Sequence, residues 1–179
     1  MTPIPNATRQ LSGELLFLLA SFAALGSLAT NIMLPAFPDM GRDLDSTAKE
    51  LSATLGTFFI AFAIGQLFVG PLSDRFGRKR LVLFGLVIFV VGSAVCALAT
   101  DLPQLIAGRI IQALGVCATS VLARAIARDL FDREQLGKAL SLIMVAMAAA
   151  PGFSPLLGGA INSLLGWRAS FWIVALLAV

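Results

Sequence analysis

Two long uncharged stretches, residues 51–69 and 81–100, flank a short basic segment at residues 70–80. A helix that crosses a bilayer needs about 20 consecutive apolar residues, and both stretches come close to that length. The segment between them holds Asp74 among four basic residues. The pattern predicts a membrane hairpin, in which two spanning helices are joined by a charged hinge.

The residue types in the hinge indicate how the chain turns there. Gly70 and Gly77 relieve backbone crowding, and Pro71 is expected to limit the preceding helix. A plainer interpretation stays open beside this one, because basic loops are common wherever a membrane protein faces the cytoplasm.

The composition is that of a membrane protein. Of the 179 residues, 58% are hydrophobic and 13% are charged, whereas a soluble domain is about half apolar and about a quarter charged. We predict an all-α polytopic membrane protein, with a polar tail at 1–13 and a helical bundle at 14–179. The predicted helices cover residues 14–38, 51–72, 81–99, 104–127, 138–165 and 169–179. The last of these has about half the length that a bilayer requires.

The distribution of basic residues predicts which way the bundle faces, since cytoplasmic loops are enriched in Lys and Arg. With the N-terminus inside, nine basic residues lie on the cytoplasmic side: Arg9, Arg75, Arg78, Lys79, Arg80, Arg124, Arg128, Arg133 and Lys138. Three lie outside, Arg42, Lys49 and Arg168, and Arg109 is set aside as intramembrane. We therefore expect a multi-pass protein with a cytoplasmic N-terminal tail.

Several polar side chains fall inside the predicted spans. Arg109 is expected to face a cavity or a partner, with Gln112 on the same helix face, although an outward, snorkelling arginine is an alternative. Asn31 and Gln66 are candidates for contact with a substrate, or else for hydrogen bonds between helices. No acidic residue lies deep in any span, although deep carboxylates are the usual proton carriers of transporters.

The predicted helix 138–165 carries Pro151 and Pro155, with Gly152, Gly158 and Gly159 close by. Prolines free backbone carbonyls and bend a helix, which in a membrane requires neighbours or a cavity to satisfy those groups. This helix is predicted to be a moving element, and a static kink is the alternative. Elsewhere, small residues such as Gly85 and Gly92, seven apart, predict close helix packing.

The sequence lacks the motifs that mark several other functional classes. The sequence has no phosphate-binding loop, no nucleophile elbow, no zinc-protease motif and no Cys/His cluster. Cys96 and Cys117 are interpreted as small packing residues. The basic residues lie in short loops without interleaved aromatic residues, which argues against a nucleic-acid partner. We expect no enzyme activity, no cofactor and no metal.

Five segments resemble signatures of the major facilitator superfamily. Residues 70–80 resemble its loop signature between the second and third helices, and residues 109–115 resemble the fourth-helix signature of its proton antiporters. Residues 151–159 are similar to the fifth-helix motif of its drug exporters, and residues 31–38 to the first-helix motif of twelve-helix drug/proton antiporters. Residues 124–129 resemble the Bcr/CflA-type multidrug exporters. The resemblance covers nearly the whole chain.

The resemblance implies a fold and a set of partners. The chain would form the six-helix N-terminal half of such a carrier, built from two inverted three-helix repeats. The transport site of the family lies between its two halves, near the middle of the bilayer. A missing C-terminal half, or a second chain, is therefore an expected partner, together with the lipid bilayer.

The resemblance also implies roles for particular residues. Asp74 and Arg78 would belong to a cytoplasmic latch, whose motif also contains Gly70, Arg75, Gly77 and Lys79. Arg109 and Gln112 would take part in proton coupling. An antiporter hinge would contain Pro151, Gly152, Pro155, Gly158 and Gly159. The sequence departs from the family at two positions: many relatives carry an aspartate in place of Asn31, and Ser154 replaces a usual glycine.

The implied function is proton-coupled efflux of small hydrophobic drugs by alternating access, in the inner membrane of a bacterium, with protons and a small-molecule substrate as partners. A metabolite or sugar carrier on the same scaffold is an alternative, in which Asn31 and Gln66 would bind a polar solute. A truncated chain that only inserts and associates is another. The reading frame after Val179 would distinguish this last alternative.

Overall fold

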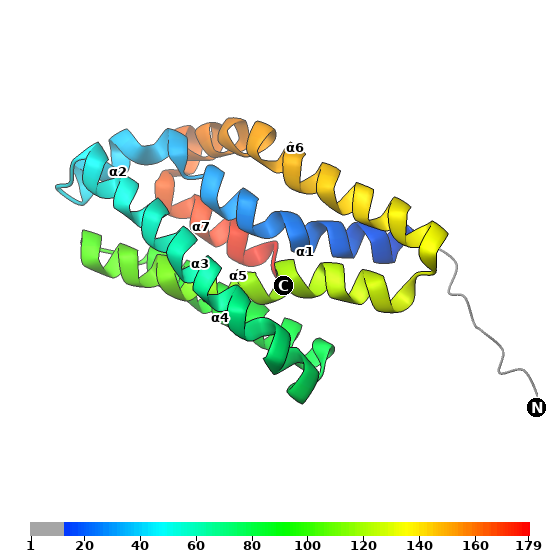
Figure 1. Ribbon diagram of the computed structural model, residues 1–179. Helices are drawn as coiled ribbons and strands as arrows, with labels where there is room; N and C mark the ends of the chain where they lie inside the picture. The colour runs from blue at the N-terminus through cyan, green and yellow to red at the C-terminus, as the bar shows by residue number, and fades with distance from the viewer. Residues whose placement is uncertain (1–12) are drawn as a thin grey trace, which may run out of the picture.

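The computed structural model describes residues 13–179, apart from the side chain of Glu134, and in this part of the chain helices are joined by short turns, with no strand. Apart from Gly13, the predicted tail at 1–13 lies outside the described residues. Figure 1 shows the elements in an elongated bundle. They are α1 (Gly13–Asn31), the 3₁₀ helix η1 (Leu34–Ala36), α2 (Phe37–Asp43), α3 (Ala48–Phe76), α4 (Arg78–Ala97), α5 (Leu102–Leu130), α6 (Arg133–Leu165) and α7 (Trp167–Leu176).

The first predicted span, 14–38, is divided in the structure. The α-helix α1 ends at Asn31, and the chain continues through η1 into α2. Prolines stand at the start of both later elements, Pro35 in η1 and Pro38 in α2. A proline cannot donate a backbone hydrogen bond to the preceding turn, so it suits the first turn of a new helix better than the interior of a longer one.

The hinge at 70–80 is almost entirely helical. The helix α3 runs through Pro71 to Phe76, and α4 begins at Arg78. The prediction that Pro71 limits the helix is therefore wrong, since a spanning helix tolerates an internal proline when its other hydrogen bonds continue. Gly77 turns the chain with φ of 86°, a conformation open to glycine, and its N–H bonds to the carbonyl of Ser73 at 2.9 Å.

Side-chain caps fix the starts of three helices. Thr47 and Glu50 form a reciprocal capping box at α3. Asp101 accepts a hydrogen bond from the backbone N–H of Gln104 at the start of α5, and Asp132 accepts one from Gln135 at the start of α6. The helices therefore begin a few residues before their predicted starts, because hydropathy marks the apolar run and not the polar turn that begins the helix.

The helices pair in a pattern that repeats. The helices α1 and α6 lie side by side along much of their length (Figure 1), and α3 packs on α5 in the same way. If the first three spans (α1, α3 and α4) are matched in order with the last three (α5, α6 and α7), the pair of α1 and α6 corresponds to the pair of α5 and α3. The most extensive contact is between α4 and α5, where a Cβ added at Gly92 or Gly115 would overlap the backbone of the facing helix.

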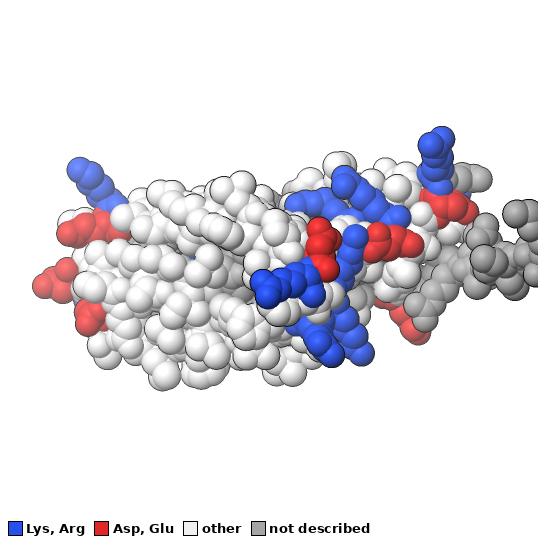
Figure 2. Space-filling view, turned by 60° about the horizontal axis from the view of Figure 1, so that its bottom comes forward, with Lys and Arg blue, Asp and Glu red and all other residues white. Residues whose placement is uncertain are grey.

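Five helical segments are long and apolar enough to cross a membrane: Gly13–Asp43, Ala48–Phe76, Arg78–Ala97, Leu102–Leu130 and Gln135–Leu165. The sixth, α7, has ten residues. Figure 2 shows charged side chains gathered toward the two ends of the bundle, with an uncharged band between them. The all-α polytopic fold expected from the sequence is thereby confirmed.

Candidate functional site

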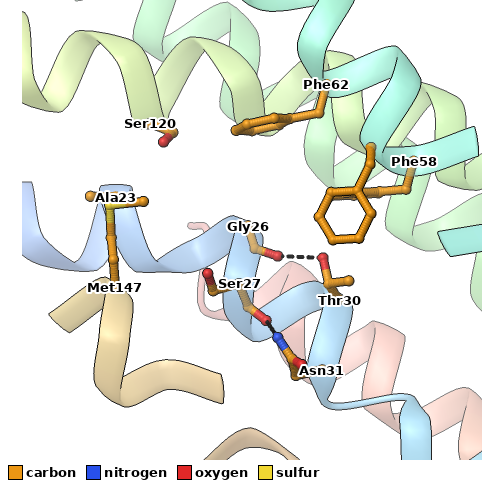
Figure 3. A pocket seen from close by; sticks show the side chains of 10 residues that line it. Ala23, Gly26, Ser27, Thr30, Asn31, Phe58, Phe62, Ser120 and Met147 are labelled. Atoms are coloured by element: carbon orange, nitrogen blue, oxygen red, sulfur yellow. Dashed lines mark hydrogen bonds between the residues drawn. The ribbon is translucent and has the colours of Figure 1, made fainter. Parts of the chain in front are cut away.

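A cavity of about 120 Å³ opens between α1, α3, α5 and α6. Figure 3 shows the phenyl rings of Phe58 and Phe62 on one side of it and α1 on another. Its walls are mostly apolar. The lining residues are Ala23, Gly26, Ser27, Thr30, Asn31, Phe58, Phe59, Phe62, Ser120 and Met147.

The polar residues of α1 in this cavity are bonded to their own helix. Thr30 Oγ1 donates to the carbonyl of Gly26, and Asn31 Nδ2 donates to that of Ser27, each at 2.7 Å (Figure 3). Asn31 thus lines the cavity, while one of its two amide N–H groups is bonded within α1. Gln66 is half-buried on α3 and is not among the described residues that line the cavity.

Arg109 is completely buried and joins three helices. Its Nη1 donates to the backbone carbonyl of Ala29 on α1 at 3.2 Å and to Oε1 of Gln112 at 2.5 Å. Gln112 Nε2 in turn donates to Oγ of Ser93 on α4 at 2.7 Å. The outward, snorkelling orientation of Arg109 is therefore wrong, and the structure brings Arg109 and Gln112 together as their spacing predicts.

An aromatic ring covers the guanidinium of Arg109. Its Cζ lies 4.2 Å from the centroid of the Phe58 ring, a cation–π contact. Phe58 also lines the cavity, so the cavity and the buried cation contact the same side chain. The sequence alone did not indicate Phe58, because an aromatic residue in an apolar span is ordinarily a packing residue.

A second polar region lies where α3 meets α4. Arg78 Nη1 is 2.5 Å from Oδ2 of Asp129 near the end of α5, and this ion pair ties the start of one helix to the end of another. Asp74 is exposed and forms no ion pair among the described residues. Asp129 was not predicted as a site residue, although it lies in the segment 124–129, which resembles an exporter motif.

The other residues of the segment 70–80 have few contacts within the described part of the chain. Gly70 lies inside α3, and a Cβ there would meet nothing within 4 Å. Arg75 lies over the ring of Phe76 at 5.4 Å, and Lys79 is exposed. The face at Gly70 is thus open within the described part of this chain.

The residues of the segment 151–159 lie on different faces of α6, which continues unbroken through both prolines. Pro151 and Gly152 are exposed, and Pro155 is half-buried. Gly158 is buried, and a Cβ there would overlap the carbonyl oxygen of Ile32, at the point where α1 gives way to η1. Gly159 lies near Pro35, since a Cβ added at this glycine would be 3.8 Å from the Cβ of the proline.

A polar cluster that the sequence analysis missed joins α2 to the turn between α6 and α7. Asp43 Oδ2 accepts hydrogen bonds from Trp167 Nε1 and Arg168 Nη1, both at 2.9 Å. Asp39 Oδ2 accepts one from Asn162 Nδ2 at 2.5 Å. These partners are more than 120 residues apart in the sequence, so no local pattern connects them.

The sequence of this chain is similar to those of several known proteins. The chain is 35% identical over 169 residues to "Multidrug resistance protein D" of Escherichia coli, covering 94% of this chain and 43% of that protein. It is 38% identical over 160 residues to "Chloramphenicol resistance protein" of Pseudomonas aeruginosa, covering 89% and 38%. It is 32% identical over 161 residues to "Bicyclomycin resistance protein homolog" of Haemophilus influenzae, covering 90% and 40%.

The chain spans about two fifths of the length of these relatives. Residues 16–179 match the description "Major Facilitator Superfamily". The match includes every helix from α3 to α7 and nearly all of α1. By its sequence, this chain belongs to the Major Facilitator Superfamily.

Proposed function

We propose that the chain forms half of a secondary active transporter that exports small hydrophobic drugs in exchange for protons, by alternating access. The observation that carries the proposal is the cavity between α1, α3, α5 and α6, which is lined by aromatic and aliphatic side chains and lies beside the buried Arg109. The relatives named for resistance to drugs support the same function.

The lining of the cavity favours a drug over a sugar. A sugar needs free donors and acceptors to replace its bonds to water. Here the hydroxyl of Thr30 and one amide N–H of Asn31 are already donated to carbonyls of α1, which leaves few polar groups, chiefly the hydroxyls of Ser27 and Ser120. Three phenylalanines of α3 also line the cavity. An apolar compound replaces few hydrogen bonds, so this cavity suits it better.

The proposed setting is the inner membrane of a bacterium, with the N-terminus in the cytoplasm. The end of the bundle that holds Arg78 and Asp129 would then be cytoplasmic, and the end that holds Asp43 and Arg168 would face outward. The family resemblance assigns the residues around Gly77 to a latch, Arg109 and Gln112 to proton coupling, and the Pro151–Gly159 segment to a hinge. A second half, or a second chain, would complete the carrier.

Transport in everted membrane vesicles tests the proposal. The vesicles carry the chain alone, or the chain together with the C-terminal half of the Escherichia coli relative. With an acidic lumen, an antiporter moves drug inward, so we expect radiolabelled chloramphenicol to accumulate and to leave when the pH gradient is collapsed. Accumulation equal to that of empty vesicles in both preparations would contradict the proposed function.

A further inference from the structure

Arg109 has more hydrogen-bonding capacity than its surroundings use. Its Nη1 is bonded to Ala29 and Gln112, but its Nε and Nη2 are buried without a hydrogen-bond partner. No carboxylate of the described residues forms an ion pair with it. Because a guanidinium stays charged and its buried N–H groups require acceptors, an anionic acceptor would suit this position.

The guanidinium of Arg109 lies against a ring that also lines the cavity. Phe58 lines the cavity, and its ring centroid is 4.2 Å from Cζ of Arg109. The Phe58 ring is nearly parallel to that of Phe62, with 10° between the planes and 6.2 Å between the centroids. Figure 3 shows these two rings side by side at the cavity. A flat aromatic ligand would find a stacking surface there, with a positive charge behind it.

We propose that the cavity and Arg109 together bind a small aromatic compound that carries an anionic group, with the ring against Phe58 and Phe62 and the anion on Nε and Nη2 of Arg109. This inference rests on the proposed function and names a class of substrate for it. In this proposed complex the Phe58 side chain rotates enough to uncover Nε and Nη2, and its ring stays in contact with that of the ligand. Gln112 and Ala29 hold the other edge of the guanidinium and keep its free edge available.

The cavity has the size of a single ring. Its volume of about 120 Å³ is near the roughly 150 Å³ of an apolar protein cavity that takes up benzene. Benzoate and benzamide therefore make a matched pair of probes, since they have almost the same shape and differ in charge. A carboxylate forms paired, charge-assisted bonds with a guanidinium, whereas the neutral amide does not.

Equilibrium dialysis tests the proposal with the 179-residue chain in lipid nanodiscs, radiolabelled benzoate and competing benzamide. We expect benzoate to bind more tightly by on the order of tenfold, because charge-assisted hydrogen bonds are about twice as strong as neutral ones. Arg109→Gln should abolish this preference. Arg42→Gln, which removes an exposed arginine near the end of α2, should retain it and serves as the matched control.

A second variant keeps the proposal testable if Arg109→Gln does not fold. Phe58→Ala removes the ring that covers the guanidinium, so the ratio of benzoate to benzamide affinity should rise while the stacking contribution to both falls. Equal affinities in the wild type, no binding of either probe, or a preference that survives Arg109→Gln would each overturn the proposal.

The proposed drug export and the proposed anion site at Arg109 can be disproved independently. The transport assay needs a pH gradient, whereas the binding measurement needs none. Chloramphenicol transport without a preference for benzoate would remove the anion site and leave the exporter function. An Arg109-dependent preference for benzoate without drug transport would leave the site and remove the exporter function.

Discussion

Gly158 shows how much one residue decides at the interface between α6 and the end of α1. Its missing side chain lets α6 rest on the backbone at Ile32, where the first span changes from α1 to η1. Small residues permit this kind of approach between helices in lipid. The same helix carries Gly152, where a Cβ would meet nothing within 4 Å.

Gly158→Ala should destabilise the protein by about 1–3 kcal/mol, the usual cost of overpacking a close contact. Gly152→Ala is the matched control, because it makes the same change on an open face of the same helix. The measurement is the midpoint of thermal unfolding in detergent, followed by tryptophan fluorescence. Equal midpoints for the two variants would show that α6 does not rest on Ile32.

Arg109 depends on Gln112 for an acceptor and, through it, on Ser93. Gln112→Leu keeps a similar volume but leaves Nη1 of Arg109 with one bond fewer, and the loss of a buried partner costs about 1–3 kcal/mol. We expect a lower concentration of denaturant at the unfolding midpoint. Gln66→Leu, at a half-buried position on α3, should change it little, and equal losses in both variants would argue against the network.

At the residue scale, the sequence indicated which residues were unusual, but it did not indicate which residues they contact. Arg109 stood out because a charge in an apolar span is rare, and its neighbour Gln112 followed from helical spacing. The covering ring of Phe58 and the carbonyl of Ala29 come from other helices. Contacts of that kind depend on tertiary packing, which one sequence without relatives does not specify.

Among the elements, the apolar cores of the spans were predictable and their ends were not. Hydropathy located every long helix, since lipid demands a continuous apolar run. The structure lengthens α3 past Pro71 and divides the first span after Asn31. Whether a proline ends a helix depends on the hydrogen bonds of the surrounding residues, so Pro71 and Pro35 acted differently despite being the same residue type.

The ion pair between Arg78 and Asp129 should couple the start of α4 to the end of α5. Both side chains are partly exposed, at 32% and 51%, so screening by solvent keeps the coupling small. We expect a double-mutant cycle with Arg78→Gln and Asp129→Asn to give about 0.2–1 kcal/mol, decreasing with added salt. The charge reversal Arg78→Asp with Asp129→Arg should recover part of it, and a coupling of zero at low salt would contradict the pairing.

For the molecule as a whole, the excess of basic residues at one end of the bundle predicts a single orientation in the membrane. Lys49 lies at one end and Lys138 at the other, both exposed, whereas Cys96 and Cys117 are buried. In intact bacterial cells a membrane-impermeant maleimide should label Lys49→Cys. It should label Lys138→Cys only after the membrane is permeabilised. The reverse result would invert the proposed topology.

The connection between α3 and α4 has a consequence for how the length of this protein can vary. An exposed turn is ordinarily a place where a chain accepts extra residues. Here a single glycine separates the two helices. One residue inserted into the first turn of α4 would rotate the rest of that helix by about 100° and swing Gly85 and Gly92 off the surface of α5. Relatives of this chain should therefore rarely gain or lose a residue at the position of Gly77.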